Sequence, residues 1–168
     1  SIGGFAQEFN VPQSVDSYPL TEIKNDGKLS WVIDMVSCDK FYTYVHITNT
    51  ITHRKEGTLT LPTNTKLYAN GSLYNIRGWL VNVDGNNRRY TPGTSFYYPS
   101  GNQNNTISNW LVFAKIPYGV NKVNLSVGDF QWSDLTVLQN EDPLILTDWT
   151  EEALRVYWQQ NGIQEFEG

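Results

Sequence analysis

The residues with the clearest potential for ligand chemistry lie between positions 88 and 105. They combine tyrosines with arginine and asparagine: Tyr90, Tyr97, Tyr98, Arg88, Asn102 and Asn104. Sugar-binding surfaces stack pyranose rings on aromatic side chains and bind the hydroxyl groups through amides and guanidinium groups. The segment is therefore a candidate carbohydrate-binding site, with Trp79 or Trp110 as possible additions. An ordinary connection between strands explains the same residues, and only alternate members of 96–98 can share one face of a strand.

Two residues are candidates for hydrolytic chemistry. Cys38 is the single cysteine and ends an apolar strand pattern, which favours a buried thiol. His46 alternates with Tyr42 and Tyr44 along a strand, and no carboxylate or nucleophile stands near it in the sequence. A hydrolase would need the fold to bring such a partner within hydrogen-bonding distance of the imidazole. Since the G-x-S-x-G motif is also missing, the sequence predicts no catalytic residue and a protein that is not an enzyme.

Metal and cofactor sites are not expected. The stretch NVDGNN places Asn82, Asp84 and Asn86 like the first ligands of a calcium loop, but the sixth residue is Asn87 and the twelfth is Gly93. A calcium loop needs glycine at the sixth position and a bidentate glutamate at the twelfth. A hairpin turn at Asp84–Gly85 explains the same residues.

Composition narrows the class of partner. The net charge is −5 and the sequence pI is about 4.9, without the basic surface of a nucleic-acid-binding protein. No apolar run is long enough to span a membrane. Aromatic residues make up 14% and charged residues only 17%. The Asn-, Thr- and Tyr-rich composition is typical of exported bacterial proteins, so we expect a periplasmic, cell-surface or secreted location.

Alternating apolar and polar residues predict strands through most of the chain. LSWVIDMVSC and FYTYVHITNT form a predicted hairpin, and Asn70–Gly71 and Asp84–Gly85 predict two more turns. Short strands at this spacing favour an all-β fold, an antiparallel β-sandwich over residues 1–146. Residues 147–168 predict a capping helix and the start of a linker, because Asp148 and Glu151 form a capping box and Asn161–Gly162 a stop.

The strand motifs resemble those of immunoglobulin-like, telokin-like β-sandwich domains in secreted Bacteroidetes proteins of unknown function. The similar residues span about 29–168 and fall into three groups: Leu67, Tyr68, Gly71 and Tyr74; then Ile116, Pro117 and Gly119; then Val123, Leu125 and Val127. The resemblance implies an exported accessory domain without catalytic residues, followed by a further domain after Gly168. The segment 86–105 is longer and more polar than the corresponding segment of these domains.

These observations predict a non-catalytic accessory or interaction domain of an exported bacterial protein. Its partner is expected to be a protein or a glycan. A carbohydrate-binding module that uses the aromatic residues of 90–105 is the main alternative, and a hydrolase is the third.

Overall fold

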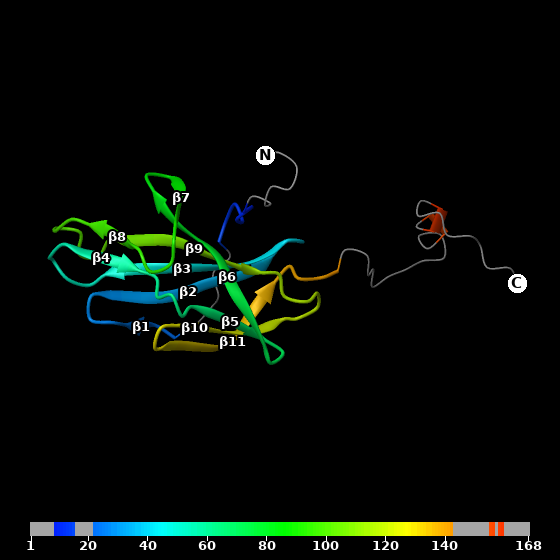
Figure 1. Ribbon diagram of the computed structural model, residues 1–168. Helices are drawn as coiled ribbons and strands as arrows, with labels where there is room; N and C mark the ends of the chain where they lie inside the picture. The colour runs from blue at the N-terminus through cyan, green and yellow to red at the C-terminus, as the bar shows by residue number, and fades with distance from the viewer. Residues whose placement is uncertain (1–8, 16–21, 143–154, 157, 160–168) are drawn as a thin grey trace, which may run out of the picture.

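The computed structural model describes residues 9–15, 22–142, 155–156 and 158–159. These residues form an all-β structure, shown in Figure 1. The strands are β1 (Lys24–Asn25), β2 (Leu29–Cys38), β3 (Tyr42–Ile51), β4 (Gly57–Thr60), β5 (Lys66–Ala69), β6 (Ser72–Val83), β7 (Asn86–Tyr90), β8 (Ser95–Tyr98), β9 (Thr106–Ala114), β10 (Lys122–Val127) and β11 (Phe130–Leu138).

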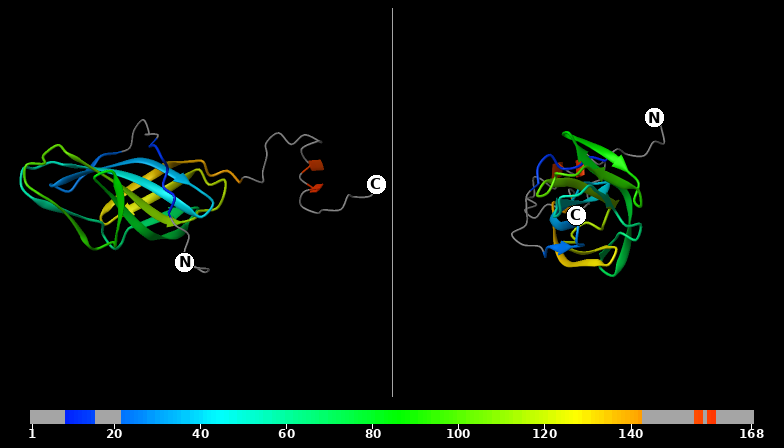
Figure 2. Two further views of the ribbon diagram at one scale, coloured as in Figure 1. Left: turned by 90° about the horizontal axis from the view of Figure 1, so that it is seen from above. Right: turned by 90° about the vertical axis from the view of Figure 1, so that its left-hand side faces the viewer.

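Seven strands close into a barrel in the order β2-β11-β10-β5-β6-β9-β3, and β3 pairs again with β2. All pairs are antiparallel except the short contact of β11 with β2, which is parallel. The right-hand view of Figure 2 looks along the barrel and shows the strands around a closed section. Closure gives each of the seven strands a hydrogen-bonded neighbour on both sides over part of its length, and the contact of β11 with β2 consists of Val137–Val36 and Leu138–Ser37.

The all-β prediction is confirmed, but the strands form a closed barrel and not the predicted sandwich of two separate sheets. A sandwich has two sheets that pack face to face without hydrogen bonds between them. Here β2 pairs with β3 on one side and with β11 on the other, which joins the two halves. The hairpin of β2 and β3, and the turns at Asn70–Gly71 and Asp84–Gly85, form as predicted, and all four turn residues have positive φ.

The predicted C-terminal helix lies largely outside the described residues. Within its span, Arg155, Val156, Trp158 and Gln159 are described, and all four have helical backbone. The boundary predicted at residues 146–147 also lies outside the described part.

Alternation places large apolar side chains inside the barrel, with a change of phase at two bulges. In β2, Trp31 and Ile33 point inward, and so do Val36 and Cys38, because the register shifts between Ile33 and Met35. The extra residue there is Asp34, which points outward together with Met35. A second shift, between Ile76 and Gly78, does the same in β6. Bulges of this kind re-aim side chains without ending the pairing.

A hydrogen-bonded polar group also lies inside the barrel. The side chain of Asn109 accepts a hydrogen bond from Trp79 Nε1 at 3.0 Å. Its amide nitrogen donates to the Ile47 carbonyl and to Asn49 Oδ1, both at 3.0 Å. Asn49 in turn donates to the Ser30 carbonyl at 3.1 Å. Because each of these amides is fully buried, the hydrogen bonds offset the cost of removing them from water.

Residues 9–15, here called the strap, cover part of the outer surface. They lie over a second apolar cluster formed by Met35, Tyr44, Leu80, Trp110 and Val112. The left-hand view of Figure 2 shows this dark blue segment crossing the cyan strands. The backbone N–H of Asn10 donates to the hydroxyl of Tyr44 at 2.9 Å. Phe9 packs edge-on against Tyr42, with ring centroids 4.9 Å apart, and the Arg89 guanidinium lies over its ring.

Candidate functional site

The tyrosines of residues 90–98 do not share one exposed surface. Tyr97 is 62% exposed, whereas Tyr98 is 3% exposed and belongs to the barrel core. Tyr90 is half-buried and packs its ring against Trp79 and Phe96. The alternation expected for 96–98 is therefore confirmed, since Tyr97 faces water while its two neighbours face inward. Trp79 and Trp110 are buried as well.

The polar residues of the same segment mostly support loop structure. The amide of Asn102 donates to the Pro99 carbonyl at 2.9 Å and accepts from Asn105 at 2.8 Å. Asn104 adopts φ 72° and its backbone N–H donates to the Ile51 carbonyl, so it forms the turn into β9. Arg88 is exposed on β7, on a different hairpin. Tyr97 is thus the exposed ring among the tyrosines that the sequence indicated.

A hydrogen-bonded chain of aspartate, histidine and serine lies on the outer face of β2, β3 and β9. His46 Nδ1 is 2.7 Å from Asp34 Oδ2, and His46 Nε2 is 2.7 Å from Ser108 Oγ. The hydroxyl of Thr48 also donates to Asp34 Oδ2. The partners of His46 therefore come from 12 and 62 residues away, which explains why the sequence around the histidine did not reveal them.

The bulge in β2 explains this geometry. Regular alternation would point only one of Asp34 and Met35 outward, but the extra residue lets both do so beside His46. With a proton on Nδ1 donated to the carboxylate, the lone pair on Nε2 can accept the hydroxyl proton of Ser108. This arrangement matches the orientation of a base-activated serine.

Burial limits the access of a substrate to the hydrogen-bonded Asp34, His46 and Ser108. His46 is 5% exposed and its ring packs edge-on against Trp110, with centroids 4.6 Å apart. Ser108 and Thr48 are half-buried. Cys38 lies inside the barrel, where burial raises the pKa of its thiol, so it is not near His46 and is poorly suited to be a nucleophile.

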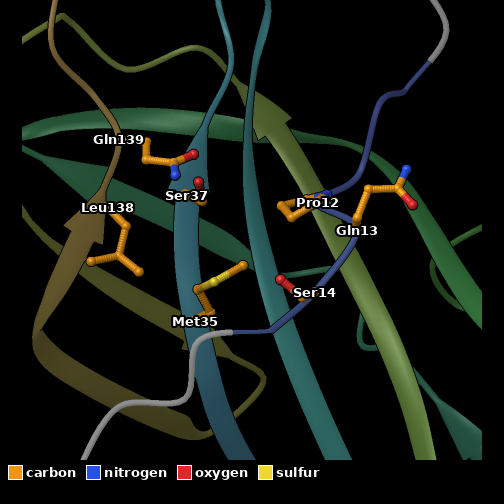
Figure 3. Close-up of a pocket in the computed structure, with 7 residues that line it drawn as sticks. All are labelled: Pro12, Gln13, Ser14, Met35, Ser37, Leu138 and Gln139. Carbon is orange, nitrogen blue, oxygen red and sulfur yellow. The ribbon is translucent and has the colours of Figure 1, made fainter.

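A cavity of about 190 Å³ lies between the strap, β2 and the end of β11, and Figure 3 shows its lining. The strap contributes Pro12, Gln13 and Ser14. The side chains of Met35 and Ser37 come from β2, and those of Leu138 and Gln139 come from β11 and the residue after it. The cavity is smaller than the pockets that usually bind organic ligands.

A second surface, which sequence reasoning did not find, lies on the outer side of β10, β5 and β6. At its centre Tyr68 is 38% exposed, paired with Asn124 on one side and with Leu73 on the other. The next row pairs Lys66 with Ser126 and with Asn75. Inward-pointing Leu67 and Leu125 leave these residues to point outward. We call this set, together with Lys122, the Tyr68 face.

The Tyr68 face continues into a surface hollow of about 360 Å³ at the end of the barrel. Asn70 and Lys122 border both, and the loop after β9 supplies Pro117, Tyr118, Gly119, Val120 and Asn121. Tyr118 is 41% exposed, and the Lys115 ammonium lies 4.0 Å from the centre of its ring. Exposed aromatic rings such as Tyr68 and Tyr118 are typical of ligand-binding surfaces.

The loop that carries Tyr118 is firmly held. The buried amide of Asn140 donates to the carbonyls of Pro117 and Val120, both at 2.9 Å. Lys115 Nζ donates to Asn140 Oδ1, and desolvation lowers the pKa of this lysine. The hollow is therefore preformed, which reduces the ordering cost of binding.

The described residues contain no cluster of three or more His, Cys, Asp or Glu side chains arranged to hold a metal ion. In the same part of the chain, no helix is long and apolar enough to cross a membrane. Comparison of the chain with protein-family models, with curated proteins and with solved structures gives no significant match.

Proposed function

We propose that this protein is a non-catalytic interaction domain that binds its partner through the Tyr68 face. The observation that supports the proposal is the cross-strand row Asn124–Tyr68–Leu73, which exposes an aromatic and an aliphatic side chain next to each other. Exposed aromatic residues surrounded by polar groups are enriched at binding surfaces. Because β5 is paired on both sides, the row is held rigidly in the barrel wall.

We also propose that the protein is exported from a bacterial cell. The acidic, Asn- and Tyr-rich composition supports a domain of an exported bacterial protein. A relation to the immunoglobulin-like, telokin-like domains of Bacteroidetes is a hypothesis that depends on the strand motifs alone. Binding through the Tyr68 face does not require that relation.

The experiment that tests the proposed function maps the binding surface. Amide spectra of labelled protein are recorded with neutral and anionic polysaccharides and with acidic and basic peptides. We expect at least one probe to shift resonances in β5, β6 and β10, and the shifts to disappear in Tyr68→Ala. Tyr97→Ala is the matched control, because Tyr97 is an exposed tyrosine on β8. The proposal is wrong if no probe binds, or if binding is insensitive to Tyr68→Ala.

A second candidate function is ester hydrolysis at Ser108, favoured by the two 2.7 Å contacts of His46. Ser108 Oγ would attack the ester carbonyl while its proton passes to His46 Nε2 and on to the departing alkoxide. Water would then release the acid and restore the serine. This candidate ranks second because the His46 ring is buried against Trp110.

A fluorophosphonate probe tests the second candidate directly, since such probes form a covalent bond only with activated serines. Labelling at Ser108 that is lost in His46→Gln and reduced in Asp34→Asn would support it. Ser108→Ala supplies the blank. If folded wild-type protein shows no increase in mass after incubation with the probe, the hydrolase candidate is eliminated.

A further inference from the structure

We propose that the ligand of the Tyr68 face is an anionic polysaccharide, one whose pyranose units carry carboxylates. The inference rests on the proposed function and specifies its ligand. It follows from three features of the surface: its ring and amide arrangement, its two lysines, and the closed hydrogen bonding of its strands.

The first feature is the chemistry around the Tyr68 ring. Directly paired residues on one face of a sheet have Cβ atoms about 5 Å apart, so the Asn124 amide flanks Tyr68 on the side opposite Leu73. A pyranose ring has an apolar face that can stack on the tyrosine, while its hydroxyl groups donate and accept at the rim. The exposed Asn75 amide matches hydroxyl groups because it can also do both. Asn124 Oδ1 accepts from the backbone N–H of Asp134 at 2.9 Å, so Asn124 offers its N–H groups as donors.

The second feature is local positive charge on an acidic protein. Lys66 precedes Tyr68 by two residues on the same outer side of β5, and Lys122 precedes Asn124 by two residues on β10. Lys66 therefore neighbours Tyr68 along β5, and Lys122 lies diagonally from it on β10, toward the opposite end of β5. Lys122 Nζ donates to Thr136 Oγ1 at 2.9 Å, which leaves two N–H groups. Neither lysine forms an ion pair with another described residue.

The third feature separates a glycan from a peptide. Extended peptides bind sheets chiefly by adding a strand at an open edge, where main-chain hydrogen bonds supply affinity. β5 is flanked by β10 and β6, so its main chain is already paired along the Tyr68 face. Recognition must then use side chains alone, as it does for sugars.

The adjoining hollow extends the surface along a chain. Lys122 and Asn70 border both the Tyr68 face and the hollow, and Tyr118 provides a second exposed ring there. One face of that ring lies against Lys115. A polysaccharide lying along β5 would thus meet Tyr68 first and Tyr118 beyond the Asn70–Gly71 turn, with a lysine beside each ring.

Three soluble polymers separate the contributions to binding by calorimetric titration. Polygalacturonate has pyranose rings and carboxylates, fully methyl-esterified homogalacturonan has the rings without the charge, and poly-L-glutamate has the charge without the rings. We expect polygalacturonate to bind at least 10-fold more tightly than either of the others. Its affinity should fall as salt is raised, because Lys122 is exposed and Lys66 is half-buried, so that salt screens their charges.

Variants then locate the binding. Tyr68→Ala should weaken polygalacturonate binding about 10-fold, while Tyr68→Phe, which keeps the ring, should retain most of it. Lys66→Gln combined with Lys122→Gln should remove the preference for polygalacturonate over its methyl ester. Tyr97→Ala and Lys55→Gln, at exposed positions away from this face, should change nothing.

The outcomes distinguish the inference from the proposed function. Equal binding of the methyl ester or of poly-L-glutamate through Tyr68 would overturn the anionic-glycan inference and leave the interaction surface intact. Polygalacturonate binding that is unchanged in folded Tyr68→Ala protein would overturn both. Absence of polygalacturonate binding, with another probe still shifting the β5 resonances, would overturn the inference alone.

Discussion

Replacing Asn109 with leucine tests whether the buried polar group holds the barrel together. The side chain of Asn109 makes hydrogen bonds to groups on β6 and β3, through Trp79, Asn49 and the Ile47 carbonyl. Leucine has a similar size but no polar atom. The variant therefore leaves the indole N–H of Trp79 and the amide oxygen of Asn49 buried without these partners.

The expected loss of stability follows from those two groups. A buried polar group left without a hydrogen bond costs about 1–3 kcal/mol, so Asn109→Leu should reduce the free energy of unfolding by about 2–6 kcal/mol. For a domain of this size, 1 kcal/mol corresponds to a shift of about 2–4 °C in the midpoint of thermal unfolding. A midpoint lowered by about 10 °C is the central expectation, against a total stability of about 5–15 kcal/mol.

Chemical denaturation, followed by tryptophan fluorescence, provides the measurement, and a double-mutant cycle provides the control. Trp79→Phe removes the indole N–H, so adding Asn109→Leu to that background should cost about 1–3 kcal/mol less than in the wild type. If Asn109→Leu changes stability by less than about 0.5 kcal/mol, or if the two substitutions are additive, the polar group does not contribute as argued.

Three further predictions concern single sites. Burial, aided by the hydrogen bond to Asp39, raises the pKa of Tyr44, so the unfolded chain loses that proton first and stability should fall as pH rises above about 10. Denaturation curves should show a shallower fall in Tyr44→Phe. Gly78→Ala should displace the Phe9 ring, which a Cβ would overlap, and thermolysin should then cut the strap faster than in the wild type. Cys38 is 7% exposed, with a raised pKa, so iodoacetamide should label it only after unfolding, as read by mass spectrometry.

The candidate sites show how far local patterns reach. Alternation correctly placed Tyr97 on the face opposite Phe96 and Tyr98, because the two faces of a strand are fixed by its geometry. Only the structure shows that Tyr97 is the one that faces water. The same reasoning left His46 without partners. Asp34 reaches it through a bulge and Ser108 through the pairing of β3 with β9, and neither event leaves a local signature in the sequence.

The Tyr68 face was missed for a related reason. Tyr68, Lys66 and Asn75 belong to the hairpin that the Asn70–Gly71 turn predicts, so their common side was accessible to sequence reasoning. Asn124 and Lys122 join them only because β10 pairs with β5. About fifty residues separate the two strands, and that pairing completes the surface.

The sequence alone determined the strands, most of their turns and the alternation of buried and exposed residues between bulges. These properties depend on interactions within a few residues, where positive φ at Asn70–Gly71 and period-two patterning have local causes. Tertiary structure decided the closure of the sheet into a barrel, the phase changes at Asp34 and beside Gly78, and the neighbours of His46 and Tyr68. The physical reason is that strand partners are selected by the joint burial of distant segments, which no single segment specifies.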